Sequence, residues 1–234
     1  MWVFGRRREV AEPAAMVLQT RAMDGFYHLS AQKLIARLLV HGPGAFAAYG
    51  GVLGSSRHSA TNLTGVDALD ASMMERCIRL SDEAVRHGEL PFAAIICRGG
   101  EVLVEATNRV KRDQDIARHA EVVAISEAQK LLGSSNFEDC TLYSNVEPCP
   151  MCAFMAREAR IRRVVFSLKS PIIGGYSRWD ILSDRGLSTR MPEMFGDSPE
   201  VVGGLLAEEA AKVWRRWNPI AWGVMRLRGI FSRI

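Results

Sequence analysis

The sequence lacks any uninterrupted apolar run of the roughly 18 residues that a membrane-spanning helix requires. It also has no convincing signal peptide, because no short apolar segment follows the arginines near its start. Its charge shows no strong bias, since 30 basic and 26 acidic residues give a formal net charge of +4. So mild an excess permits contact with nucleic acid without demanding it. We therefore expect no membrane partner, and both small molecules and nucleic acids remain open.

Cysteine is scarce and odd in number, which argues against a disulfide framework. An odd count without a secretory signal indicates a reducing compartment, so we expect a cytoplasmic protein whose thiols are free or bound to metal. Two of the cysteines fall within apolar patterns and are expected to be small core residues. These two are Cys77 and Cys97, and the other three cysteines are Cys140, Cys149 and Cys152.

The chain divides by composition near residue 65. Residues 1–65 contain three consecutive arginines and a Gly/Ser-rich stretch, and we expect a poorly ordered or loosely helical extension without an assigned function. A targeting peptide and a gene start placed too early are both compatible with it. Residues 66–234 suit one domain of ordinary size that ends in a helix and a basic tail.

Periodic patterns in this second part predict alternating helices and strands. Helical spacing begins at Asp70, a plausible N-cap, and stops at Gly88, while short apolar runs rich in β-branched residues indicate strands. The order helix, two strands, helix, strand, helix, strand predicts an α/β sandwich. Beyond the first helix, we expect strands over 92–98, 101–107, 140–146 and 161–168 and helices over 119–132, 149–160 and 205–217.

The chemistry is concentrated in His119-Ala120-Glu121 and Pro148-Cys149-Pro150-Met151-Cys152. One histidine and two cysteines are three protein ligands, the number that a catalytic zinc takes when it keeps a fourth position for water. Cysteines at i and i+3 lie on one helix face, and a helix N-terminus favours thiolate over thiol. Glu121 would stand beside the metal without binding it and move protons. The spacing is typical of zinc-dependent nucleobase deaminases.

Two other interpretations use only part of this pattern. A thioredoxin-like redox pair would need only Cys149 and Cys152 and would leave His119 and Glu121 as coincidences. A closed structural zinc site would need a fourth ligand, for which Cys140 is the nearest candidate. We therefore favour a catalytic Zn²⁺ held by His119, Cys149 and Cys152.

With these motifs, the chain resembles the cytidine/deoxycytidylate deaminase superfamily, in the branch of guanine deaminases and tRNA adenosine deaminases. The resemblance covers roughly residues 70–185. Besides the two motifs above, the segments 89–94 and 107–109 carry it. It implies a three-layer α/β/α sandwich with a mixed central sheet, and a homodimer. It further implies that Asn108 and the backbone of Ala120 bind the target base, although an asparagine after a strand is also a common turn residue.

The resemblance leaves the substrate open. The segment 106–110 looks like the guanine deaminases, so we favour a free nucleobase or nucleoside of the guanine type and a role in purine metabolism. The alternative is tRNA, with adenosine converted to inosine at the anticodon wobble position. A deaminase fold kept only as a binding partner is a third interpretation, against which Glu121 argues.

Several residues bear on that choice. Arg118 could contact a phosphate or ribose or could simply be solvated, and Phe92 could line the pocket or belong to the core. Glu158 departs from both subgroups, and the segment Ser177–Asp180 has no assigned role. The place to look for a tRNA footprint is a loose basic cluster, which we expect to be solvated surface, at Arg157, Arg160, Arg162, Arg163 and Lys169.

Overall fold

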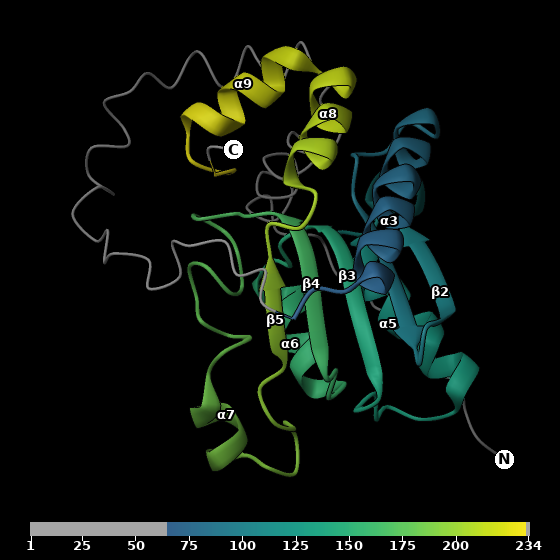
Figure 1. The fold of residues 1–234 in the computed structure, drawn as a ribbon, viewed down its shortest axis with the longest axis vertical. Helices are drawn as coiled ribbons and strands as arrows, with labels where there is room; N and C mark the ends of the chain where they lie inside the picture. Colours follow the sequence, from purple (N-terminus) through teal and green to yellow (C-terminus); the bar gives the residue numbers. More distant parts are fainter. Residues whose placement is uncertain (1–64, 233–234) are drawn as a thin grey trace, which may run out of the picture. The chain divides into compact units, whose positions relative to one another are not determined.

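The computed structural model describes residues 65–232, which form a five-stranded sheet with helices on both faces (Figure 1). The strand order is β2-β1-β3-β4-β5. Strand β1 pairs antiparallel with both β2 and β3, whereas β3, β4 and β5 are parallel, so the sheet is mixed. The strands are β1 (Ala93–Arg98), β2 (Glu101–Thr107), β3 (Cys140–Val146), β4 (Arg163–Leu168) and β5 (Glu200–Gly203).

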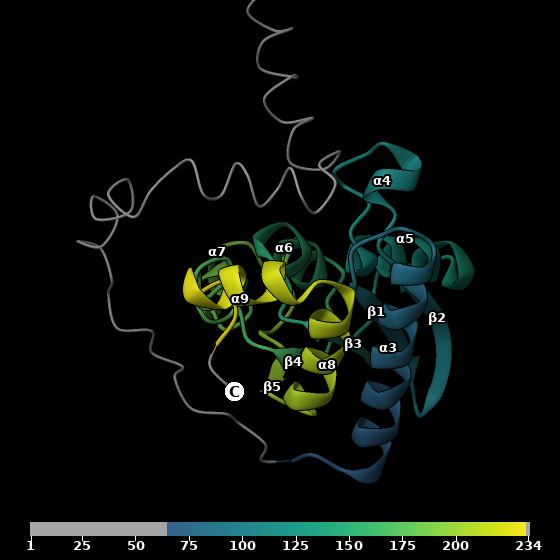
Figure 2. The ribbon, with the colours of Figure 1, turned by 90° about the horizontal axis from the view of Figure 1, so that it is seen from above.

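The helices cover the sheet in two layers, with α3 and α8 on one face and α5 and α6 on the other (Figure 2). The predicted α/β/α sandwich with a mixed sheet is therefore confirmed. The helices are α3 (Ala68–Arg86), α4 (Val110–Asp113), α5 (Ala120–Leu132), α6 (Pro150–Glu158), α7 (Arg185–Arg190), α8 (Ala207–Trp217) and α9 (Pro219–Leu227).

The strands supply both cores because successive side chains point to opposite faces of a sheet. Ile95 and Tyr143 pack with α3 and α8, whereas Ile96 and Leu142 pack with α5 and α6. All four are buried. The strands in the middle of the sheet are therefore buried along almost their whole length rather than on alternate residues.

The start of α3 differs from the prediction. Asp67, not Asp70, is the N-cap, and its side chain accepts a hydrogen bond from the backbone N–H of Asp70 at 2.8 Å. Asp70 completes a capping box from the third helical position, and its buried carboxylate also pairs with Arg163 and accepts from the Tyr143 hydroxyl. The prediction was wrong because an aspartate suits both the N-cap and the third helical position of a capping box, and Asp70 occupies the second of these.

Past β4, the structure contains three elements that the periodic patterns did not predict, namely α7, β5 and α9. The expected basic tail is in part helix α9, whose Trp222 stacks on Phe231 with ring centroids 5.2 Å apart. Trp214 of α8 packs against the same Phe231 at 4.9 Å, so these aromatic residues are core. Residues 1–64 of the extension expected from the sequence lie outside the described residues.

A search of the described part of the chain finds no helix with the length and apolar character needed to cross a membrane.

Candidate metal centre and active site

The predicted metal ligands lie at the starts of two helices that cover the same face of the sheet. His119 is the N-cap of α5, and Cys149 is the N-cap of α6. Pro150 occupies the first turn of α6, where the missing N–H costs no helical hydrogen bond. Cys152 follows three residues after Cys149 and therefore points from the same side of the helix.

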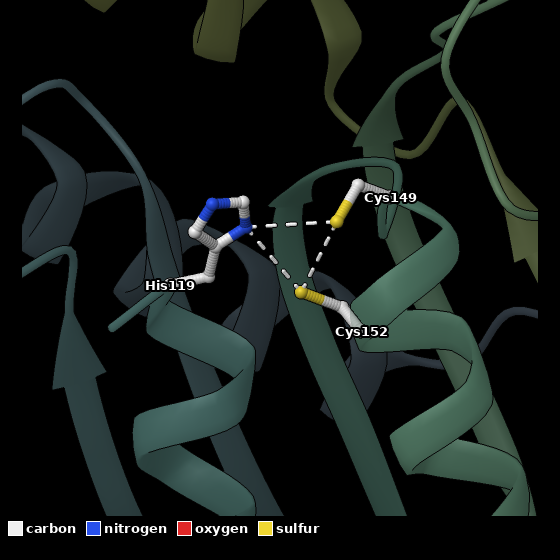
Figure 3. A group of neighbouring side chains, drawn as sticks. All are labelled: His119, Cys149 and Cys152. Atoms are coloured by element: carbon white, nitrogen blue, oxygen red, sulfur yellow. Dashed lines mark hydrogen bonds between the residues drawn. The ribbon is translucent and has the colours of Figure 1, made fainter. Parts of the chain in front are cut away.

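The three side chains converge (Figure 3), and their ligand atoms lie within 4.8 Å of one another. The two sulfurs are 3.5 Å apart, and each is 3.6 Å from Nδ1 of His119. In a tetrahedral site with Zn–S of about 2.3 Å and Zn–N of about 2.0–2.1 Å, the corresponding edges are about 3.5–3.8 Å. These residues therefore fit a zinc ion, and they leave its fourth position to a non-protein ligand.

The electrostatics of the two cysteines suit a metal cation. The hydrogen bond with Cys152 and the interaction with His119 together lower the pKa of the Cys149 thiol to about 4, against the effect of burial. The same hydrogen bond, together with burial, raises the pKa of Cys152. One thiol is thus already a thiolate at neutral pH, and a divalent cation would displace the proton that remains.

Glu121 lies in the first turn of α5, buried beside the metal ligands but outside the ligand cluster. Burial, followed by the nearby Cys149, raises the pKa of this carboxyl. Oγ of Ser144 on β3 lies 3.2 Å from its Oε1 and 2.7 Å from the carbonyl oxygen of Val146. A hydroxyl can donate to the carboxylate, or donate to Val146 and accept from the protonated acid, so Ser144 suits both states of Glu121.

Asn108 follows β2 directly and is buried. Its backbone N–H donates to the Phe92 carbonyl at 3.0 Å, and the next N–H, of Arg109, donates to the Arg118 carbonyl at 2.9 Å. Because Arg118 precedes the ligand His119, this second bond ties the asparagine loop to the start of α5. Ala120, the other expected base-binding residue, is the fully buried first residue of α5.

Glu147 organises the loop that follows β4. Its buried carboxylate accepts hydrogen bonds from the backbone N–H groups of Ser170, Tyr176 and Ser177 and from the Ser177 hydroxyl, at 2.6–3.1 Å. A Cβ on Gly174 would lie 2.1 Å from Oε1 of this carboxylate, so only glycine fits there. The unassigned segment Ser177–Asp180 therefore begins with an anchor to the residue just before the metal motif.

The expectation that the loose basic cluster is solvated surface is wrong for two of its residues, Arg157 and Arg163. Arg157 is 1% exposed, and it donates to the carbonyls of Ile181 and Asp184 and to the Ser188 hydroxyl at 2.7–2.9 Å. Arg163 pairs with Asp70 beside the other face of the sheet. These two arginines hold the fold together and are not free for a nucleic acid.

Two other open questions receive a structural answer. Phe92 packs edge-on against Trp214 with ring centroids 5.0 Å apart, and it is a half-buried residue in contact with the cores on both faces of the sheet. Arg118 lies 3.6 Å from the Asp113 carboxylate and 3.5 Å from that of Asp115, so it is neither simply solvated nor unpaired. Glu158 is exposed on α6.

Three supporting residues were not assigned roles from the sequence. They are Ser144, Glu147 and Glu89, whose carboxylate accepts a hydrogen bond from Nδ2 of Asn108 at 3.0 Å. Glu89 and Glu147 stand inside the stretches that carry the family resemblance, and their position there was the only available signal. Their partners come from 19 to 30 residues away in the chain, a distance at which spacing rules give no guidance.

The comparisons with known proteins agree with this site. The family model of the cytidine and deoxycytidylate deaminase zinc-binding region matches residues 68–168, which include all three metal ligands. The tRNA-specific adenosine deaminase of Bacillus subtilis is 35% identical over 140 residues, 60% of this chain and 83% of the relative. The guanine deaminase of the same organism is 38% identical over 97 residues, 41% of this chain and 62% of the relative.

A tRNA(Ile)-lysidine synthase of Deinococcus deserti is 35% identical over 150 residues, which are 64% of this chain. The match covers 26% of that relative, so the chain spans about a quarter of its length. Among solved structures, one from a study of A-to-I editing by tRNA:A34 deaminases at the wobble position has a TM-score of 0.54 and 29% identity. It covers 61% of this chain and 98% of the other.

Proposed function

Because this chain belongs to the cytidine and deoxycytidylate deaminase superfamily, we propose that it hydrolyses an aminated nucleobase or nucleoside and releases ammonia. The observation that carries the proposal is the convergence of His119, Cys149 and Cys152 beside a buried glutamate that lies outside their ligand cluster. A redox pair would not need the histidine or Glu121. Among the described residues, the ligand cluster contains only these three, which argues against a closed structural site.

The residues divide the reaction between them. A zinc ion at this site supplies Lewis-acid activation of water. Glu121 takes a proton from the attacking water and passes it to a ring nitrogen, and it then carries the remaining proton of the added hydroxyl to the leaving amino group. One C–O bond forms and the C–N bond to the amino group breaks, so a carbonyl oxygen takes the place of the amino group and ammonia leaves. Burial raises the pKa of this carboxyl, so it holds a proton more readily than an exposed glutamate does. Asn108 and the backbone of Ala120 hold the base in place.

For the substrate, we propose a free base or nucleoside of the guanine type. The segment 106–110 and the guanine deaminase relative support this choice. In addition, Arg157 and Arg163 are bound within the fold and do not offer a surface for RNA. We keep the homodimer and the cytoplasmic location as predictions.

Adenosine in a tRNA anticodon is the second candidate. The matching region covers 83% of a tRNA-specific adenosine deaminase but 62% of the guanine deaminase, which supports the tRNA interpretation. Residues Arg109, Arg112 and Arg118 surround the carboxylate of Asp113, and this charge beside the proposed base site suits a phosphate.

A panel of substrates tests both candidates. Zinc-loaded protein would be assayed for ammonia release from guanine, adenine, cytosine and their nucleosides, and for inosine formation in an anticodon stem-loop RNA. We expect turnover of guanine or guanosine. Activity on the RNA alone would replace that choice with the tRNA candidate, and no activity on any member, with zinc bound, would contradict the proposed reaction.

A further inference from the structure

A second buried carboxylate lies on the base-binding side of the site. Glu89 is 4% exposed, and its oxygens accept hydrogen bonds from three donors. The donors are the side-chain Nδ2 of Asn108 at 3.0 Å, the backbone N–H of Arg112 at 2.7 Å and that of Lys111 at 3.3 Å. The mechanism proposed above gives this carboxylate no role.

The chemistry of these partners fixes one side chain in a single orientation. A carboxylate only accepts hydrogen bonds, whereas the asparagine amide can donate from one end and accept from the other. If Asn108 were turned over, its Oδ1 would face Glu89, and two buried acceptors would repel each other. The Nδ2 end must therefore face Glu89. Among the described residues, Oδ1 of Asn108 has no hydrogen-bond donor.

Glu89 itself is held by other contacts. Its two bonds to backbone N–H groups cap α4, whose N-cap, Arg109, makes no side-chain capping bond. Asn145 fastens the chain just after Glu89 by accepting from the Ala93 N–H and donating to the Pro91 carbonyl, both at 2.8 Å. The carboxylate is thus a fixed reference point and not a side chain that follows Asn108.

We propose that Glu89 is a positioning residue that presents Oδ1 of Asn108 to the bound base. The inference rests on the proposed function, because it takes Asn108 as a base-binding residue. The consequence is a rule of selectivity: the group of the base that meets Oδ1 must be an N–H donor. A base with a lone pair at that point would leave two acceptors facing each other and would be rejected.

The orientation can be tested without any substrate. In zinc-loaded, ¹⁵N-labelled full-length protein, the side-chain amide signals of Asn108 are those lost in Asn108→Ala. We expect their hydrogen exchange to be at least ten-fold slower than that of exposed Asn136. In Glu89→Gln one acceptor oxygen becomes an NH2 group, which cannot accept from the Asn108 amide or from the backbone N–H groups, so the protection should fall to within three-fold of Asn136. Unchanged protection in Glu89→Gln would overturn the proposal.

A double-mutant cycle tests whether Glu89 acts through Asn108. With guanine as substrate, or the anticodon stem-loop if only that is turned over, we expect Asn108→Ala and Glu89→Gln each to lower kcat/KM about 10–100-fold. The double variant should be no worse than Asn108→Ala alone. Losses that multiply would show an independent structural role and would contradict the inference.

Controls separate this inference from the function beneath it. Glu101→Gln makes the same chemical change at an exposed position and should match the wild type in both experiments. Zinc content should equal that of the wild type in every variant, because none of these residues is a ligand. If the wild type turns over no substrate, the proposed function fails, whereas the exchange experiment still decides the orientation of Asn108.

Discussion

The two sides of the site are built differently. On the metal side, His119, Cys149 and Cys152 stand at helix starts, and the local geometry of α5 and α6 directs their side chains. On the side where we propose that the base binds, Asn108 lies in a loop held by the buried carboxylate of Glu89, and the loop over 170–177 is held in the same way by Glu147. The metal side therefore depends on short-range spacing, and the base side depends on contacts between distant parts of the chain.

This difference separates reaction from selectivity. The position of a residue at a helix start is fixed largely by the helix that follows it, so we expect the metal site to tolerate changes in more distant loops. A loop held by one carboxylate can be redirected by a single substitution. We therefore expect substitutions on the metal side to abolish the reaction, and substitutions on the base side to change which base is accepted.

Removing a metal ligand should have the most severe consequence. Cys149→Ser deletes one of three ligands, so we expect loss of zinc, measured by elemental analysis, and a fall in kcat/KM of at least about 10³-fold. Cys140→Ser is the matched control, because Cys140 is buried but lies outside the ligand cluster. Zinc retained by Cys149→Ser would contradict the assigned ligand set.

Disturbing the Glu147 loop should have an intermediate effect. A methyl group on Gly174 would collide with the Glu147 carboxylate, so we expect Gly174→Ala to lower the free energy of unfolding by about 1–3 kcal/mol. Gly223→Ala is the control, since its new Cβ meets nothing within 4 Å and it lies inside α9. There we expect a gain of about 1 kcal/mol. Urea unfolding of both variants measures the difference, and equal effects would show that the loop is not tightly anchored.

The smallest expected effect is on the pH dependence of stability, and it arises from Asp70, which lies outside the site. Burial raises the pKa of Asp70, but hydrogen bonds from Arg163 and Tyr143 outweigh it and hold the pKa below its usual value of 3.8. Such a group stabilises the fold above its unfolded pKa, and the contribution disappears as pH falls through the folded pKa. The urea midpoint should therefore drop more between pH 5 and pH 2 in the wild type than in Asp70→Asn. Equal drops would exclude Asp70 as a source of acid sensitivity.

Much of the fold could be predicted from the sequence, because strands such as 101–107 and 140–146 are marked by local patterns. The convergence of His119, Cys149 and Cys152 was predictable for the same reason, because their spacing places them at helix starts. The role of Arg157 was not, because an arginine on a helix looks solvated until the carbonyls of Ile181 and Asp184 fold over it. Strand β5 escaped prediction because only four residues pair with β4, without a periodic signal.

The most direct test compares the wild type with Glu121→Gln at equal zinc occupancy. Glutamine keeps the size of the side chain but cannot carry the proton between water, ring and leaving group. We predict full zinc content in both proteins and a loss of ammonia release of at least about 10³-fold in the variant. Undiminished ammonia release from the zinc-loaded Glu121→Gln protein would contradict the proposed chemistry.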